Sequence, residues 1–193
     1  ARSRDHAVRL IDAGQVLVGG SVATKAATQV DTASAVLVRE VEQDPGYASR
    51  GAYKLVGALD ALPVPVTGRF CLDAGASTGG FTDVLLRRGA AHVVAVDVGY
   101  GQLVWRLRTD PRVTVMDRTN VRDLEPSALT RPADLVVSDL SFISLTLVLP
   151  ALARVAAPDA DLLLMVKPQF EVGRGRLGKG GVVRDPGHRA DAV

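Results

Sequence analysis

From Arg69 onward, short apolar segments alternate with segments of helical character. The apolar segments predict strands at 70–72, 93–96, 113–116, 135–138 and 162–166, and the segments between them predict helices at about 79–88, 101–108, 126–130 and 144–156. Strands that are apolar along their whole length and separated by helices are typical of a parallel sheet covered on both faces. We therefore expect an α/β fold with a Rossmann-like sheet.

The first 40 residues have a different pattern. A short helix with Ala7, Leu10 and Ile11 on one face is followed by strand candidates around Gly19-Gly20 and at 36–38, which predicts a small α+β unit. Residues 41–48 are mostly polar and contain Pro45-Gly46, which indicates a linker. We expect three segments: a small domain at 1–40, a linker at 41–48 and the α/β domain at 49–193. We also expect both ends to be truncated, because no initiating Met is present and a helix pattern begins close to Val193.

Composition excludes several classes of protein. With 23 Lys and Arg against 21 Asp and Glu, the net charge of +2 does not indicate a partner. The single cysteine, Cys71, fits a reducing compartment, so we expect a cytoplasmic protein. The longest apolar run, about 90–96, is far shorter than the roughly 20 residues that span a bilayer. The three histidines lack metal-ligand spacing, and we expect no metal and no membrane insertion.

A glycine-rich turn joins the first predicted strand of the α/β domain to its first helix. It contains Asp73, Gly75, Ser77, Thr78 and Gly79, and in this fold such a turn lies at the ligand crevice. A carboxylate here would repel the pyrophosphate of a dinucleotide, whereas it would attract the ammonium and sulfonium groups of S-adenosylmethionine. The turn therefore favours S-adenosylmethionine as cofactor, with an Asp that only binds turn N–H groups as the structural alternative.

Polar residues also follow the second and third predicted strands. Asp97 ends the second strand, where an acidic side chain can accept the hydroxyls of a ribose in either cofactor class. Its structural alternative is a cap for the next helix. Asp117 and Asn120 follow the third strand, and their position predicts contact with an adenine ring.

Charged residues follow the last two predicted strands. Asp139 follows the fourth strand, and Lys167 ends an apolar run before Pro168. A lysine at a buried strand end is costly unless it is paired, and Asp139 is the nearest expected partner. Lys54 lies on the helix before the sheet. The pair of Asp139 and Lys167 is either a structural salt bridge or part of the active crevice.

These segments together resemble the TlyA family of S4-domain ribosomal RNA 2′-O-methyltransferases, historically called hemolysins, and the second half resembles the FtsJ-like methyltransferases. The matching pieces are Ser49–Leu55 (SRGAYKL), Cys71–Thr82 (CLDAGASTGGFT), Asp97–Gln102 (DVGYGQ), Ser138–Leu145 (SDLSFISL) and Leu164–Gly173 (LMVKPQFEVG). The N-terminal unit looks like an S4 RNA-binding module.

The resemblance implies S-adenosylmethionine as methyl donor and a cytidine 2′-hydroxyl of ribosomal RNA, free or in a ribosomal subunit, as acceptor. It also implies a Lys-Asp-Lys-Glu catalytic set, of which Lys54, Asp139 and Lys167 match by motif. The glutamate is expected beyond Val193, since Glu171 follows Lys167 too closely. Lys167 is the candidate base. Lys54 and partial desolvation favour its neutral form and Asp139 favours its charged form, so a purely orienting role stays open.

Two basic segments are candidates for RNA binding. The N-terminal unit offers Arg2, Arg4 and Lys25, and the glycine-rich stretch 173–181 offers Arg174, Arg176 and Lys179. Such residues contact phosphates and position an RNA without reading its sequence. A solvated linker is the alternative for 173–181.

Two other functions compete with the methyltransferase. A nicotinamide-dependent oxidoreductase shares the sheet and Asp97, but Asp73 and the lack of a clean G-x-G-x-x-G argue against it. A non-enzymatic RNA-binding module is the second alternative.

Overall fold

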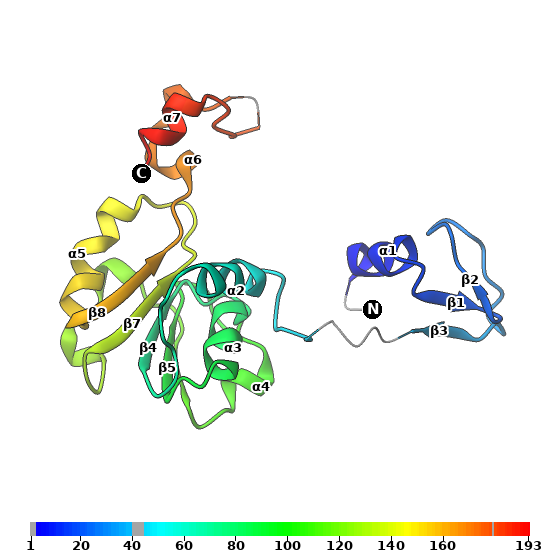
Figure 1. Cartoon of the computed structure of the whole chain (residues 1–193), viewed down its shortest axis with the longest axis horizontal. Helices are drawn as coiled ribbons and strands as arrows, with labels where there is room; N and C mark the ends of the chain where they lie inside the picture. Colours follow the sequence, from blue (N-terminus) through cyan, green and yellow to red (C-terminus); the bar gives the residue numbers. More distant parts are fainter. Residues whose placement is uncertain (1–2, 40–44, 179) are drawn as a thin grey trace. The chain divides into compact units, whose positions relative to one another are not determined.

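The computed structural model describes residues 3–39, 45–178 and 180–193. The chain divides into two compact units, Ala1–Gly46 and Tyr47–Val193. The division falls inside the segment 41–48, for which the sequence predicts a linker. Figure 1 shows the course of the chain from blue to red.

The N-terminal unit is small. Helix α1 (Arg4–Asp12) begins after Ser3, whose hydroxyl accepts the backbone N–H of His6 at 3.1 Å. Strands β1 (Val16–Val18), β2 (Ser21–Val22) and β3 (Val36–Val38) form an antiparallel sheet with the order β2-β1-β3. Gly19 and Gly20 both have positive φ, which allows the tight turn between β1 and β2. Val16 is the single fully buried apolar residue among those described in this unit.

A five-stranded parallel sheet organises the second unit. Its strands are β4 (Phe70–Ala74), β5 (His92–Val96), β6 (Val113–Met116), β7 (Ala133–Ser138) and β8 (Ala156–Leu164), in the order β6-β5-β4-β7-β8. From β4 the chain adds β5 and β6 on one side, and it then returns to add β7 and β8 on the other side of β4. The carboxyl ends of β4 and β7 are therefore the switch point at which a doubly wound sheet forms its crevice. The parallel α/β fold predicted from the sequence is confirmed.

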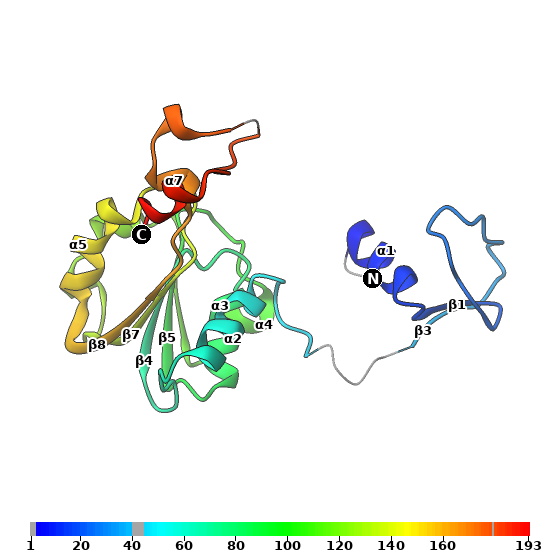
Figure 2. The same ribbon diagram turned by 45° about the horizontal axis from the view of Figure 1, so that its top comes forward.

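Helices cover both faces of this sheet (Figures 1 and 2). One face packs against α2 (Ala52–Ala61), α3 (Gly80–Arg87) and α4 (Trp105–Arg108), with Leu55 and Leu85 fully buried. The other face packs against α5 (Leu145–Val155) and the 3₁₀ turn η1 (Val121–Asp123), with Val148 and Leu152 in its core. After β8 come three short elements, α6 (Pro168–Glu171), η3 (Arg174–Arg176) and α7 (Pro186–Ala190).

Three predicted elements differ from the structure. The helix expected at 101–108 is only the four-residue α4, and the one expected at 126–130 is the 3₁₀ turn η2 (Pro126–Ala128). Both segments are short, and short helices are marginal unless tertiary packing supports them. Strand β8 begins at Ala156 rather than 162, because a register shift opposite Ala133 and Leu135 extends its pairing with β7.

Among the described residues, no helix is long and apolar enough to cross a membrane.

Candidate active site

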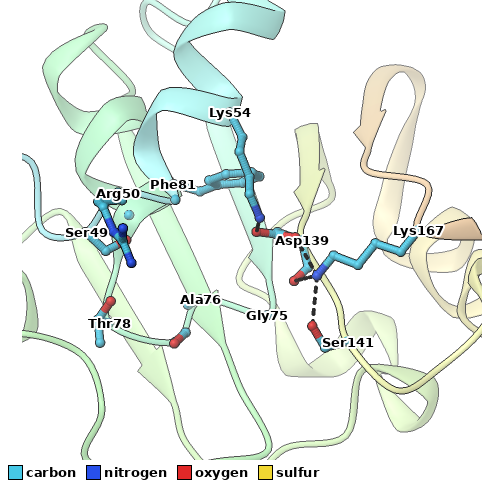
Figure 3. A pocket seen from close by; sticks show the side chains of 13 residues that line it. Ser49, Arg50, Lys54, Gly75, Ala76, Thr78, Phe81, Asp139, Ser141 and Lys167 are labelled. Carbon is cyan, nitrogen blue, oxygen red and sulfur yellow. Dashed lines mark hydrogen bonds and ion pairs between the residues drawn. The ribbon is translucent and has the colours of Figure 1, made fainter. Parts of the chain in front are cut away.

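A pocket of about 630 Å³ opens at the carboxyl ends of β4 and β7 (Figure 3). Four segments form it: the start of α2, the glycine-rich turn after β4, the loop after β7 and the loop after β8. The lining residues are Ser49, Arg50, Gly51, Lys54, Gly75, Ala76, Ser77, Thr78, Gly80, Phe81, Asp139, Ser141 and Lys167. The pocket is thus at the switch point of the sheet, and its volume is in the range usual for small-molecule sites.

The glycine-rich turn has a backbone that most residues cannot adopt. Gly75 and Gly79 have φ values of +94° and +98°. A Cβ on Gly79 would lie 2.4 Å from Leu107 Cδ1, so this position has no room for a side chain. The backbone N–H groups of Gly75 and Ala76 both donate to the carbonyl of Val96, at 2.9 and 3.0 Å, which fastens the turn to β5. The turn is therefore rigid and brings backbone close to the pocket.

Asp73 is buried beneath this turn rather than exposed in the pocket. It is inaccessible to solvent and accepts the hydroxyl of Thr82 at 2.7 Å and the backbone N–H of Thr82. Burial raises the pKa of Asp73 from 3.8 to about 7, against the opposing effect of the Thr82 hydrogen bonds. Its Oδ1 is buried with no hydrogen-bond partner among the described residues. Asp73 therefore holds the first turn of α3, which is the structural alternative that the sequence left open, while one oxygen stays unused.

Asp97 joins two loops. Its Oδ2 accepts the N–H of Ser77 at 2.8 Å, and its Oδ1 accepts the N–H of Gly99 at 2.7 Å. Each oxygen keeps a second lone pair for a further donor. Ser77 lines the pocket. Asp97 does not line it, but it holds the backbone of Ser77 through this hydrogen bond.

Asp117 and Asn120 also lie outside the pocket lining. Asp117 accepts a hydrogen bond from the Arg108 guanidinium at 2.9 Å and one from the backbone N–H of Gly101 at 3.2 Å. The Arg108 guanidinium lowers the pKa of the Asp117 carboxyl from its ordinary value. The Asn120 side chain accepts the N–H of Arg122 at 3.1 Å and so caps η1. Both side chains have local structural partners.

Lys54, Asp139 and Lys167 come together at the pocket although they are far apart in sequence. Asp139 lies between the two lysines: its Oδ2 is 2.8 Å from Lys54 Nζ and its Oδ1 is 2.7 Å from Lys167 Nζ. Lys54 comes from α2, Asp139 follows β7, and Lys167 follows β8 (Figure 3). Two cations and one carboxylate leave an excess of positive charge beside the glycine-rich turn.

Lys167 has more than one acceptor. In addition to its ion pair with Asp139 Oδ1, its Nζ donates to Ser141 Oγ at 2.8 Å and to the backbone carbonyl of Asp139 at 3.3 Å. The contact with Asp139 Oδ1 is an ion pair without hydrogen-bond geometry, so two of the three N–H groups of an ammonium are used in hydrogen bonds and one remains. The amino group is therefore held from three sides.

The residues predicted to bind RNA belong to two segments of the chain, one in each unit. In the N-terminal unit Arg4 is on α1 and Lys25 is exposed. In the C-terminal segment Arg174 begins η3, and Arg176 pairs with Asp191 at 2.8 Å. Arg2 and Lys179 lie outside the described residues. Arg176 therefore has a carboxylate partner that an RNA phosphate would have to replace.

Several pocket residues were not singled out from the sequence. Arg50 and Ser49 precede α2, Ser141 contacts Lys167, and Phe81 closes the pocket from α3. All four lie within the segments that carry the family resemblance. Their place in these motifs was therefore the sequence feature that could have marked them as pocket residues. Within the described part of the chain, no cluster of His, Cys, Asp or Glu has the arrangement of a metal site.

Comparison with known families agrees with this architecture. The FtsJ-like methyltransferase family matches residues 47–193, and the S4 domain family matches residues 1–36. The chain is 61% identical to the Mycobacterium tuberculosis H37Rv protein named 16S/23S rRNA (cytidine-2′-O)-methyltransferase TlyA, over all of this chain and 72% of that protein.

Solved structures show the same relationship. A candidate hemolysin from Streptococcus thermophilus superposes with a TM-score of 0.77 at 39% identity, covering all of this chain and 70% of the other. An S-adenosylmethionine-dependent methyltransferase from Mesorhizobium loti, at 21% identity and a TM-score of 0.51 over 63% of this chain and 57% of the other, shares the fold. The chain belongs to the FtsJ-like methyltransferase family, and within it to the TlyA proteins, which pair this domain with an S4 domain.

Proposed function

We propose that this chain transfers a methyl group from S-adenosylmethionine to the 2′-hydroxyl of a cytidine ribose in ribosomal RNA. The observation that carries the proposal is the placement of Asp139 between Lys54 and Lys167 at the mouth of a pocket beside the glycine-rich turn. The substrate class is supported by the printed activity of the M. tuberculosis relative and by the S4 match at residues 1–36.

The residues around the pocket fit S-adenosylmethionine. Its cationic groups would lie on the side of the turn where Asp97 has free lone pairs, and Asp73, buried beneath the turn, would act on them through its charge and not by direct contact. Its carboxylate would be held by Arg50, the cation of the pocket lining that lies outside the Lys-Asp-Lys set. When bound, this cofactor supplies a methyl group activated by a positively charged sulfur.

The chain's own residues would align the acceptor. The ribose hydroxyl would lie next to Lys167 Nζ, which two hydrogen bonds and the ion pair with Asp139 fix in place. Alignment of two reacting groups can lower a barrier by about 7–11 kcal/mol. We place this alignment, rather than a strong base, at the centre of the mechanism.

The contacts of Lys167 favour a charged, orienting group. A neutral amine has two N–H groups, and the hydrogen bonds to Ser141 Oγ and the Asp139 carbonyl would use both, which leaves no N–H for the hydroxyl. As an ammonium, Lys167 would keep these two hydrogen bonds and its ion pair with Asp139, and its third N–H would stabilise negative charge on the hydroxyl oxygen as the proton leaves to solvent. Lys54 would hold the other oxygen of Asp139 and thereby fix the carboxylate.

The basic side chains in the N-terminal unit and after β8 would contact RNA phosphates. Arg4, Lys25 and the basic residues of 173–181 are the candidates, and affinity for RNA should fall steeply with salt. A ribosomal RNA substrate would put the reaction in the cytoplasm, and the single, buried cysteine fits that compartment.

Calorimetry with S-adenosylmethionine and with NAD tests the assignment of the pocket. We expect S-adenosylmethionine to bind and NAD to give no heat, because the buried acid beneath the turn disfavours a pyrophosphate. Binding of NAD in preference to S-adenosylmethionine would contradict the proposal. An Arg50→Ala variant should weaken S-adenosylmethionine binding if Arg50 holds its carboxylate.

A further inference from the structure

Two loops carry three of the charged and polar residues at the mouth of the pocket. The loop after β7 contains Asp139 and Ser141 and runs directly into α5, and the segment after β8 contains Lys167 and runs into α6. Lys167 bridges the two at the pocket itself. A second link is the contact of the Phe142 and Phe170 rings, whose centroids are 5.3 Å apart.

A third link is made by Glu171, the last residue of α6. Its Oε2 accepts the hydroxyl of Ser144 at 2.5 Å, and its Oε1 accepts the backbone N–H of Leu145 at 2.9 Å. Ser144 is the N-cap of α5, and its own hydroxyl accepts the N–H of Thr146 at 3.2 Å. The Glu171 carboxylate therefore binds at the positive end of an 11-residue helix, where both its charge and its hydrogen bonds are favourable.

The geometry transmits this contact to the pocket. Glu171 and Lys167 are separated by a single turn of helix, α6, which begins at Pro168. Ser144 and Ser141 are likewise separated by only two residues. A fixed distance between Glu171 and Ser144 therefore limits how far Lys167 can move from Ser141 and Asp139.

We propose that Glu171 is a positioning residue for methyl transfer, which clamps the loop after β8 to the start of α5 and so keeps the Lys167 amino group against Asp139 and Ser141. This inference rests on the function proposed for the pocket. Glu171 does not touch the pocket, so its effect passes through the two loops.

The test measures kcat and KM for Glu171→Ala, Glu171→Asp and Glu171→Gln in the protein at its natural length. Misplacement of a reacting group by about 1 Å can cost about 100-fold in rate. We expect Glu171→Ala to lower kcat by at least about tenfold, while KM for S-adenosylmethionine stays within about threefold. Gln can accept the Leu145 N–H and donate to Ser144 Oγ, so Glu171→Gln should restore most of kcat.

Glu171→Asp provides a second test in case Glu171→Ala does not fold. It keeps the charge at the helix N-terminus and shortens the side chain by one methylene, so we expect a folded protein with kcat between those of Gln and Ala. A matched control is Glu125→Ala, because Glu125 pairs with Arg154 at 3.2 Å at the other end of the same helix. It should leave kcat at the wild-type value even where it lowers the melting temperature.

The outcomes separate two failures. If the wild type transfers no methyl group to ribosomal RNA, the proposed function fails. If the wild type is active and Glu171→Ala has the wild-type kcat, or if Glu171→Ala and Glu125→Ala lower kcat equally, the clamp is overturned and the proposed function stands.

Discussion

Two clusters of charged residues lie at opposite edges of the same parallel sheet. At the carboxyl edge Asp139 lies between Lys54 and Lys167. At the amino edge, Arg69 pairs with Asp161 and donates to the backbone carbonyl of Asp134 at 3.2 Å. Both clusters connect segments distant in sequence, so ion pairing alone does not identify an active site.

The two clusters differ in what their charges contact. At the amino edge, Asp134 accepts the backbone N–H of Phe70 at 2.8 Å and pairs with Arg131 at 2.5 Å, so carboxylates, guanidinium groups and backbone tie β4, β7 and β8 together. At the carboxyl edge two cations share one carboxylate and line a pocket. A balanced cluster tied to backbone stabilises the sheet, whereas an unbalanced one beside a pocket is placed to act on a ligand.

The largest expected effect is a loss of methyl-transfer activity on substitution of Lys167 in the carboxyl-edge cluster. Lys167→Ala should lower the rate of methyl transfer by about 10²–10³-fold, because it removes the group that orients the hydroxyl and stabilises its charge. Lys167→Arg keeps the charge but has no accessible lone pair, and we expect it to retain about a tenth of the wild-type rate. Single-turnover assays with ribosomal RNA measure both variants.

A base role for Lys167 would give a different result. Arg would then be as inactive as Ala, and the wild-type rate would rise about tenfold per pH unit between pH 7 and 9. A plateau in that range together with an active Arg variant supports the orienting role.

Asp73, buried beneath the glycine-rich turn at the carboxyl edge, should give the second largest effect, on stability. Burial raises its pKa to about 7, so between about pH 4 and 7 the folded protein retains a proton that the unfolded chain has lost. The free energy of unfolding therefore falls as the pH rises through this window, by up to roughly 4 kcal/mol from this group. The Asp73→Asn side chain stays neutral and can still accept a hydrogen bond from Thr82, so this variant avoids the loss of stability. The free energy of unfolding of the variant minus that of the wild type should therefore be larger at pH 8 than at pH 5.

Urea unfolding at the two pH values measures this difference. An equal difference between Asp73→Asn and wild type at pH 5 and pH 8 would show that Asp73 is charged throughout. The same variant also tests the pocket, because loss of the acid should weaken S-adenosylmethionine binding at pH 8 if its charge acts on the cofactor.

The amino-edge cluster should affect stability without affecting chemistry. Arg69→Ala leaves Asp161 and the Asp134 carbonyl without their donor, and we expect a loss of about 1–3 kcal/mol in the free energy of unfolding. The rate per folded molecule should stay close to wild type. A rate loss comparable to that of Lys167→Ala in a folded Arg69→Ala protein would erase the distinction between the two edges.

Ser141 should give the smallest effect. Ser141→Ala removes one of the two hydrogen-bond acceptors of Lys167 Nζ and leaves the ion pair with Asp139 in place. We expect a loss of about three- to tenfold in kcat, equivalent to about 1 kcal/mol, with unchanged cofactor binding. A variant with wild-type kcat would show that Asp139 alone fixes the lysine.

The sequence predicted the sheet well because its strands are buried on both faces and read as unbroken apolar runs. It also predicted that Lys54, Asp139 and Lys167 meet, since the latter two follow neighbouring strands and the first is in a family motif. Asp73 shows what the sequence cannot supply: whether its side chain points into the pocket or toward Thr82 depends on the packing of α3 against β4.

Local partners have a similar origin. Asn120 and Asp117 were expected at an adenine ring, which stays a prediction, and the structure adds donors that the sequence did not show: the Arg122 N–H for Asn120 and the Arg108 guanidinium for Asp117. Arg50 and Ser141 have no pattern of their own that marks them, because their contribution arises only when α2 and the loop after β7 meet around the pocket. Local partners and long-range contacts of this kind are properties of the folded chain.

The most direct test follows a labelled methyl group from S-adenosylmethionine into ribosomal RNA, with the RNA then digested to nucleosides. The pocket and its Lys-Asp-Lys set predict label in 2′-O-methylcytidine for the wild type and at least a 100-fold lower yield for Asp139→Asn. Label on a base, or an equal yield from a folded Asp139→Asn protein, would contradict the assignment of this pocket as a ribose methylation site.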